Sequence, residues 1–302
     1  MTTQSRRPGL TLTELVVVLA VLTLGFVVGI TWIARMRTHS WRMSCAANLS
    51  AIGKHMLMYT GDYDDPVPVA GGPSSRWTGR VADWTAPNRR QAYGLSQDDS
   101  GGQVSISASL YLLVKYPELP AKTLVCGERK WGTQERGVTE FRVDTYPVAK
   151  KNAELIDFWD FGPEPTRHVS YAYQMPYGAH KLDLGAGPRL VLAADRNPWV
   201  DSPAAKARDF SRFQPDLRPR KGTPEQARHG NTLRHEGKGQ NVLFLDCHVE
   251  FKDRPTCSLD NDNIYTSWDA QDKTRGVPPK LGSEPADAKD SLLVNDPVTP
   301  VR

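Results

Sequence analysis

The chain has 302 residues, and its 38 Lys and Arg against 34 Asp and Glu give a net charge of +4. This excess is small and dispersed, which argues against a nucleic-acid-binding protein, because such proteins present a clustered basic face. Hydrophobic residues make up 39% and charged residues 24%, as in ordinary folded proteins. The 23 Pro and 24 Gly predict many loops and short strands.

The N-terminal segment begins with a basic leader and continues into an apolar run. Arg6 and Arg7 precede Gly9, and residues 15–34 carry no charge. A helix of twenty residues rises roughly 30 Å, the thickness of the hydrocarbon core of a bilayer. An ordinary secretory signal has a shorter apolar region with its cleavage site behind it. The sequence therefore predicts a transmembrane helix over residues 10–34.

The residues around Gly9 carry a family resemblance. Gly9 followed by Leu-Thr-Leu-Thr-Glu resembles the leader site of type IV prepilins and type II secretion pseudopilins. The resemblance implies that a prepilin peptidase cuts after Gly9 and methylates the new N-terminal Leu10. It also implies that Glu14 pairs with the amine of a neighbouring subunit, since a charge in lipid is costly without a partner. Leu10 departs from the Phe most often found there, and the alternative is a plain membrane anchor with an accidental Gly-to-Glu spacing.

The orientation of this segment depends on the leader. Arg35, Arg37 and Arg42 follow the membrane run, so the positive-inside rule is ambiguous or favours the reverse orientation. The peptidase of the family acts on the cytoplasmic side, and we therefore expect the N-terminus to be cytoplasmic.

A second helical segment follows the membrane run. Apolar residues recur at spacings of four and three, which places them on one helix face: Cys45, Leu49, Ile52, Met56 and Tyr59. Gly61, Asp62 and the Asp65-Pro66 pair end the pattern. Residues 35–60 are therefore predicted to form an amphipathic stalk that packs on a globular domain.

A second resemblance covers most of the chain. The run from Cys45 to Gly53, and His235 with Asp246-Cys247-His248, are similar to a planctomycete-rich, DUF1559-like family of pseudopilin-like proteins. That family carries a His, some nine residues and then Asp-Gly-His near the C-terminus. Further matches are residues 124–126, 170–173, 195–198 and 262–266. Here the gap holds ten residues, and Cys247 replaces the usual Gly.

The C-terminal motif reads as a β-hairpin. Residues 241–245 and 248–251 are predicted strands, with Asp246 and Cys247 in a tight turn. Cys at the Gly position costs roughly 1 kcal/mol or more in a left-handed conformation. A disulfide from Cys247 to Cys257 is our hypothesis for compensation. If the region is exported, Cys45, Cys126, Cys247 and Cys257 form one or two disulfides, and the sequence leaves the three pairings open.

The polar residues of the motif have three interpretations. His229, His235, His248, Asp195 and Asp246 are types that bind metals or transfer protons. The sequence lacks the His-Glu-x-x-His, nucleophile-elbow, P-loop and dinucleotide patterns. We favour a conformational role, in which Asp246 caps the turn and His235 donates to a backbone carbonyl. A metal site on Asp195, His235 and Asp246 comes second, and catalysis third.

The loop around Asp260 and Asp262 is a candidate calcium site. The resemblance to type II pseudopilins, which hold calcium in a C-terminal loop, implies it. The EF-hand spacing is absent, and a plain polar turn is favoured.

The expected fold is α+β and pilin-like, with a long N-terminal helix packed on an antiparallel β-sheet with long loops. Its parts are a leader (1–9), a transmembrane helix (10–34), a stalk (35–60), a globular domain (61–272) and a disordered tail (273–302). Within the globular domain, we expect an irregular insertion up to about residue 120, with Trp77 and Trp84 as core aromatics. We also expect a central strand over residues 189–194 and a surface loop over residues 201–230.

The expected function is structural and non-enzymatic. The protein would be a single-pass inner-membrane protein with an extracytoplasmic, periplasmic C-terminal domain. Its partners would be membrane lipid, prepilin peptidase, and other pseudopilin subunits or the type II secretion machinery, with no nucleic acid. Because the outer domain is large for a filament subunit, the alternative is a tethered module that binds polysaccharide or another envelope partner. A metal-dependent enzyme on His235, Asp246 and His248 is a weaker alternative.

Overall fold

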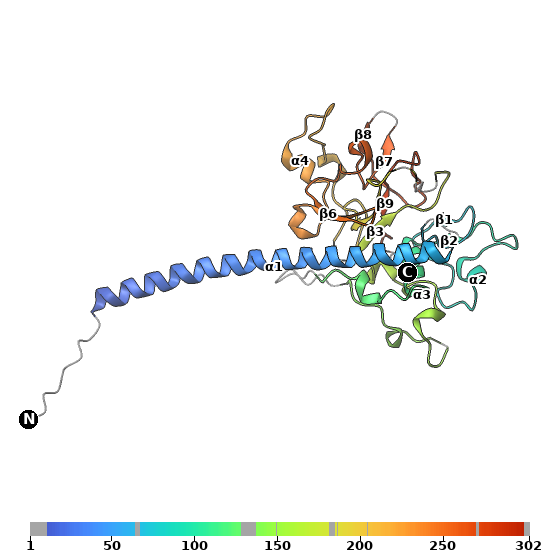
Figure 1. Cartoon of the computed structure of the whole chain (residues 1–302), viewed down its shortest axis with the longest axis horizontal. Helices are drawn as coiled ribbons and strands as arrows, with labels where there is room; N and C mark the ends of the chain where they lie inside the picture. The colour runs from blue at the N-terminus through green and yellow to red at the C-terminus, as the bar shows by residue number, and fades with distance from the viewer. Residues whose placement is uncertain are drawn as a thin grey trace, which may run out of the picture. The chain divides into compact units, whose positions relative to one another are not determined.

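The computed structural model describes residues 11–63, 67–127, 137–148, 150–180, 185, 187–203, 205–269 and 272–298. The chain divides into two compact units, Met1–Trp41 and Arg42–Arg302, and helix α1 (Leu12–Asp62) contributes residues to both (Figure 1). Gly9 and Leu10, where processing is expected, lie outside the described residues. Helices and antiparallel strands occur together, as an α+β fold requires.

The first unit contains the apolar part of α1. Leu12–Ile33 is 22 residues long, has a mean hydropathy of 2.6, and contains no buried side chain. Thr23 and Thr31 donate their hydroxyl hydrogens to the carbonyls of Ala20 and Val28 at 2.9 and 2.8 Å, so these polar groups are satisfied within the helix. This segment is long and apolar enough to cross a membrane.

The second unit begins with the remaining turns of α1, which carry the predicted apolar face. Its five side chains are each 4% exposed or less, so the stalk pattern is confirmed: Cys45, Leu49, Ile52, Met56 and Tyr59. Gly53 allows a close approach to strand β5 (Gln240–Phe244), because a Cβ there would lie 2.9 Å from Leu243 Cδ1. The helix ends at Asp62, whereas Asp65 and Pro66 lie outside the described residues.

A five-stranded antiparallel sheet, in the order β6-β5-β4-β3-β9, forms the centre of the second unit. Its remaining strands are β3 (Tyr171–Gln174), β4 (Val191–Asp195), β6 (Val249–Lys252) and β9 (Leu293–Val294). Alternate residues enter two different cores, since successive side chains point to opposite faces of a sheet. Tyr171, Tyr173 and Leu243 join the core that includes the stalk face of α1. Ala172, Val242 and Phe244 join a second core around Trp199 and Tyr265.

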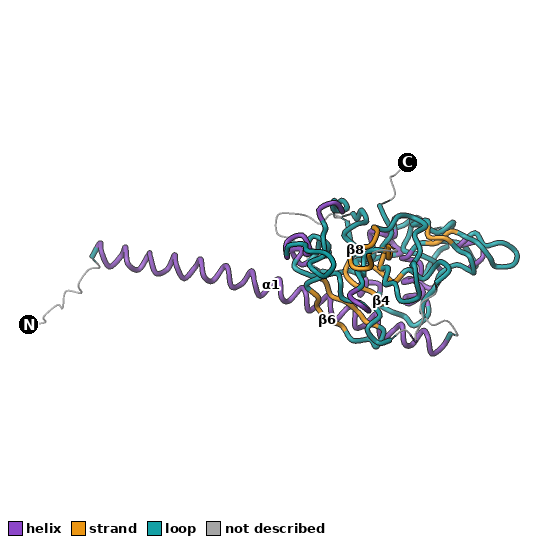
Figure 2. Tube along the Cα trace, turned by 90° about the horizontal axis from the view of Figure 1, so that it is seen from above, coloured by secondary structure: helices purple, strands orange, loops and turns teal. Residues whose placement is uncertain are grey.

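Loops make up much of the second unit, as the Pro and Gly content predicts (Figure 2). Shorter elements lie among them: β1 (Arg76–Trp77), α2 (Arg89–Tyr93), β2 (Gln103–Val104), α3 (Ile106–Lys115), α4 (Pro224–Arg228), β7 (Ser267–Asp269) and β8 (Asp272–Val277). Short 3-10 helices include η1 (Ala121–Leu124), η6 (Phe210–Arg212), η7 (His235–Gly237) and η8 (Leu259–Asn261). The expected loop over residues 201–230 thus contains η6 and α4.

Helix α3 is the main departure from the predicted irregular insertion. All ten of its residues are buried, including Ser107, Ser109 and Lys115, so it has no solvent-exposed face. Trp77 is 3% exposed, and Trp84 packs against the same core, as predicted for both.

The predicted disordered tail is wrong over residues 273–298. This segment supplies most of β8 and all of β9, and β9 pairs with β3 in the central sheet. Asp296 is buried and accepts hydrogen bonds from Trp77 Nε1 and from the backbone N–H groups of Ile106 and Ser107 at 2.8–2.9 Å. Asp296, a polar residue of the segment predicted to be disordered, therefore caps the buried N-terminus of α3. Residues 299–302 lie outside the described residues.

Candidate functional site

His235 and Asp195 form the buried centre of the C-terminal motif. Asp195 ends β4, His235 begins η7, and both side chains are 0% exposed. His235 Nε2 lies 3.0 Å from Asp195 Oδ2. The same carboxylate oxygen accepts from the backbone N–H of Asn241 at 2.7 Å and from its side-chain Nδ2 at 3.3 Å. The expected bond from His235 to a backbone carbonyl is thus replaced, at Nε2, by contact with a carboxylate.

The loop that presents His235 has an unusual backbone. His235, Glu236 and Gly237 have successive φ angles of 52°, 59° and 68°. A left-handed conformation costs roughly 1–2 kcal/mol for each residue that carries a Cβ, so surrounding contacts must hold this turn. Asn231 Nδ2 supplies two of them, donating to Gly237 O at 3.1 Å and to Asp253 O at 3.0 Å.

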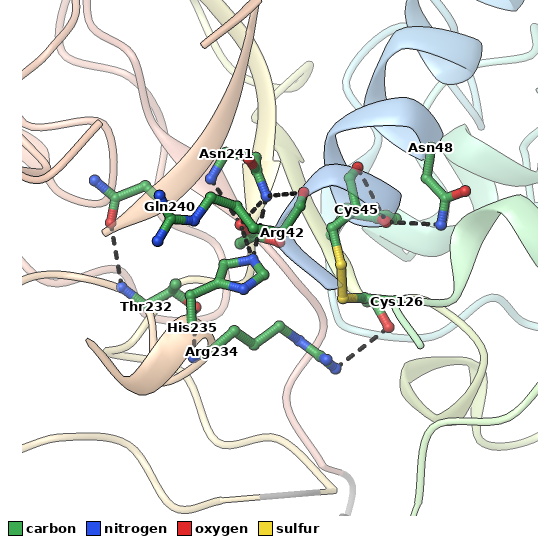
Figure 3. Close-up of polar contacts among 12 residues, drawn as sticks. Arg42, Cys45, Asn48, Cys126, Thr232, Arg234, His235, Gln240 and Asn241 are labelled. Carbon is green, nitrogen blue, oxygen red and sulfur yellow. Dashed lines mark hydrogen bonds and ion pairs between the residues drawn. A yellow bond between two sulfur atoms is a disulfide. The ribbon is translucent and has the colours of Figure 1, made fainter. Parts of the chain in front are cut away.

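The site is joined to helix α1 by polar and aromatic contacts (Figure 3). Asn241 Nδ2 donates to the Arg42 carbonyl at 3.3 Å. The Arg42 guanidinium lies 3.8 Å from the centroid of the Phe251 ring. The centroids of the Phe251 and His235 rings are 6.1 Å apart. The C-terminal motif therefore contacts the first turn of α1 in this unit.

A disulfide lies beside the same cluster. Cys45 of α1 is bonded to Cys126, which follows η1. Tyr171 OH donates to the Cys45 carbonyl at 3.5 Å and accepts from Asn48 Nδ2 at 3.0 Å. The Cys-Ala-Ala-Asn stretch and the C-terminal motif, about 190 residues apart in the sequence, thus meet at one site.

The turn residues of the motif lie elsewhere, on an exposed hairpin. Asp246 Oδ1 accepts from the backbone N–H of His248 at 3.2 Å and also contacts its ring Nδ1, so Asp246 does cap the turn. The loop has three residues rather than two, because Cys247 N donates to Phe244 O and Phe244 N donates to His248 O. Cys247 takes the left-handed position with φ 65°, as the missing Gly predicts.

The hypothesis of a disulfide between Cys247 and Cys257 is wrong. Both are free cysteines. The Cys247 thiol points to the Gly53 carbonyl at 3.6 Å, whereas Cys257 is buried in the core around Trp199. Burial raises the pKa of both thiols, so neither is an activated nucleophile.

The expected metal ligands are not brought together as a set. Candidate ligand atoms of Cys45, Cys126, Asp195 and His235 lie within 4.8 Å of one another, and Asp246 is outside this group. The disulfide uses both sulfur atoms, which leaves two protein ligands where zinc requires three or four.

In the candidate calcium loop, both carboxylate oxygens of Asp262 accept hydrogen bonds from protein groups. Asp262 Oδ1 accepts from Trp268 Nε1 at 2.5 Å, and its Oδ2 accepts from Ser291 N at 2.8 Å. Burial, and then the neighbouring Asp290, raise the pKa of Asp262. Asp260 lies on η8 with a left-handed backbone. This arrangement favours the plain polar turn.

No protein-family model, curated protein or solved structure matches this chain. The family interpretation therefore rests on the leader and motif residues themselves. Chemically, Asp195 and His235 are closed to a substrate in this conformation, since neither is exposed. In this form, the hydrogen bonds of the cluster connect β4, β5 and η7 to α1.

Two polar residues that position the site, Asn241 and Asn197, were not identified from the sequence. Asn241 lies inside the motif, but nothing in its neighbours marks it as the donor that orients Asp195. Asn197 is another, since its Nδ2 donates to the carbonyls of Tyr265 and Leu293 at 2.8 Å and so ties the β4 end to β9. Asn197 lies in the stretch 195–198 that resembles the family, and this resemblance was the one feature of the sequence that could have marked it.

Proposed function

We propose that this protein is a prepilin-like, single-pass membrane protein with a structural, non-enzymatic function, able to join a type II secretion pseudopilus or a related filament. The observation that carries the proposal is helix α1. An exposed apolar segment of membrane length has Glu14 in its first turn and continues into turns whose apolar face is buried in a globular unit. Subunits built on this plan are held by lipid until the helices associate.

The disulfide supports an extracytoplasmic position for the second unit. Cys45 and Cys126 are joined, and structural disulfides persist in oxidising compartments. With residues 42–302 outside the cytoplasm, the leader and its peptidase site lie on the cytoplasmic side of the inner membrane.

Glu14 has a local partner that any test of assembly must take into account. Its Oε2 accepts from the backbone N–H and from the hydroxyl of Thr11, both at 2.9 Å, and Thr11 Oγ1 accepts from Glu14 N at 3.3 Å. This is a capping box, in which Gln serves as well as Glu. The charge of Glu14 is therefore not needed for the cap, whereas pairing with a neighbour's amine requires it.

Glu14→Gln separates the two roles. Membranes of the native host would be treated with a hydrophobic carbodiimide, which couples the Glu14 carboxylate to the N-terminal amine of an adjacent subunit. We expect a covalent dimer whose linked peptides join Leu10 to Glu14, and its loss in Glu14→Gln. The matched control is Thr11→Val, which removes the two hydroxyl hydrogen bonds of the cap, keeps the carboxylate and should retain the crosslink.

A crosslink that survives Glu14→Gln would contradict the assembly role. So would its absence from wild-type membranes in which the protein is abundant.

A tethered binding module is the second candidate, and a pocket of about 500 Å³ favours it. The pocket lies in the second unit and has both charges on its walls. Arg89 is anchored to the Gly71 carbonyl, and Glu284 accepts from the backbone N–H of Ala179 at 3.2 Å. Its size is that of a small-ligand site. Retention of the full-length protein on a glycan array, lost in Arg89→Ala, is the expected result, and equal retention of both would remove this candidate.

A further inference from the structure

Four side chains with metal-binding atoms converge from four elements. Cys45 comes from α1, Cys126 follows η1, Asp195 ends β4 and His235 begins η7. One candidate ligand atom of each lies within 4.8 Å of the other three, and all four residues are buried. The disulfide is thus enclosed by an imidazole and a carboxylate.

The distances suit a tetrahedral ion once the sulfur atoms are separate. Zinc binds sulfur at about 2.3 Å, and nitrogen and oxygen at about 2.0–2.2 Å, which sets ligand atoms about 3.3–3.8 Å apart in a tetrahedron. The 4.8 Å limit therefore requires a contraction of about 1–1.5 Å at most, depending on the pair of ligand atoms. Opening the S–S bond moves the two sulfur atoms apart, in the direction that the tetrahedron needs.

The Asp195 carboxylate has one oxygen atom that can bind a metal ion. Asp195 Oδ1 is buried and has no hydrogen-bond partner among the residues that the structure describes. Its Oδ2 is held by the two Asn241 donors at 2.7 and 3.3 Å. Such outer contacts orient metal ligands.

Charge balance also favours a divalent ion. Two thiolates and the Asp195 carboxylate carry three negative charges, which a divalent cation reduces to one. The Arg234 guanidinium, 4% exposed, supplies a positive charge, and Figure 3 shows its side chain running past His235 toward Cys126. Buried ions need this compensation because desolvation is costly.

We infer that, on reduction, Cys45 and Cys126 form with Asp195 and His235 a Cys₂-His-Asp site for Zn²⁺. The cluster then has two exclusive forms, a disulfide and a metal centre. A dithiol reductant gives two electrons and two protons to the S–S bond and becomes a disulfide itself. Binding of Zn²⁺ releases the two thiol protons. The inference does not depend on the proposed filament.

The test uses the full-length chain in detergent with Cys247→Ser and Cys257→Ser, so that only two cysteines remain. After reduction with a phosphine, Co²⁺ is titrated as a spectroscopic probe. We expect one Co²⁺ per chain, with a thiolate-to-cobalt charge-transfer band and tetrahedral d–d bands. One equivalent of Zn²⁺ should abolish both, and the oxidised protein should show neither.

Variants assign the ligands. Cys45→Ser should remove the charge-transfer site, and Asp195→Asn should weaken Co²⁺ binding by at least about tenfold. Asp246→Asn and His248→Gln, on the exposed hairpin, are matched controls with unchanged affinity. Circular dichroism of the oxidised form of Asp195→Asn verifies that this variant folds.

Several results would overturn the inference. One is a reduced protein with no cobalt bands, and another is bands that persist in Cys45→Ser or are unchanged in Asp195→Asn. If reduction alone unfolds the protein, stoichiometric Zn²⁺ must restore its circular dichroism, and failure to do so also overturns it.

Discussion

Replacing Asp160 with Asn should stabilise the protein at neutral pH and not in acid. Asp160 is 1% exposed. Its oxygens accept from Phe161 N at 2.8 Å and from Ser105 Oγ at 2.5 Å. Burial first, and then the negative charge of Asp296, raise the pKa of Asp160 from 3.8 to about 7. The charged carboxylate is therefore disfavoured in the folded protein.

The size of the effect follows from the two pKa values. The difference between 7 and 3.8 is about three pH units, and each unit corresponds to roughly 1.4 kcal/mol, which gives about 4 kcal/mol. Well below pH 3.8 the group is protonated in both states and costs nothing. As the pH rises from 4 to 7, the unfolded chain releases its proton first, so stability is lost across this window and the loss is complete above pH 7. Asn is neutral throughout and avoids this loss. Because it has one acceptor oxygen where Asp160 uses two, either Phe161 N or Ser105 Oγ loses its acceptor, at a cost of about 1–3 kcal/mol that does not depend on pH.

The assay is urea unfolding of the full-length, oxidised protein in detergent at pH 4.5, 6 and 8, followed by tryptophan fluorescence. The free energy of unfolding of Asp160→Asn relative to wild type should be about 3 kcal/mol higher at pH 8 than at pH 4.5, with a net gain in stability at pH 8. Asp253→Asn is the control, since the Asp253 side chain is 70% exposed and its replacement should stay within about 0.5 kcal/mol at every pH. A gain independent of pH, or a loss of stability at pH 8, would refute the reasoning.

Two further predictions concern stability. Asp296→Ala leaves three buried N–H donors, from Trp77 and the first turn of α3, without an acceptor. It should cost at least about 3 kcal/mol in urea unfolding at pH 6, and a loss below about 1 kcal/mol would contradict the cap. Cys45→Ser with Cys126→Ser opens a loop of 81 residues and should cost about 4–5 kcal/mol by loop entropy. Cys247→Ser should cost far less in the same assay, and equal costs would count against the disulfide as the source.

The sequence predicted best where one local pattern determines the structure. The apolar run and the face of the stalk follow from helical periodicity, and both appear in α1. The hairpin was located within one residue at each strand end, and the left-handed Cys247 followed from the Gly that it replaces.

What the sequence did not indicate depends on contacts between distant segments. Asp296 lies in a polar stretch that resembles a disordered tail, and its cap on α3 is visible only when the chain is folded. Helix α3 is buried all round, polar residues included, so that its burial depends on the segments that fold over it.

The candidate site illustrates the same limit. Three cysteine pairings were equal in the sequence, and the folded chain brings Cys126 to the stalk and leaves Cys247 on a turn. Asp195 and His235 were chosen for their chemistry, but only folding makes them neighbours and sends Asp246 elsewhere. Residue type indicated what the groups could do, and long-range packing determined which of them meet.

The central claim, that this is a processed prepilin-like subunit, is tested most directly at its N-terminus. The measurement is intact mass and N-terminal sequencing of the protein extracted from membranes of its native host. We expect a mature chain that begins with N-methyl-Leu10 and lacks the nine leader residues. An intact Met1, or a cut at any other position, would contradict the claim and leave α1 as a plain membrane anchor.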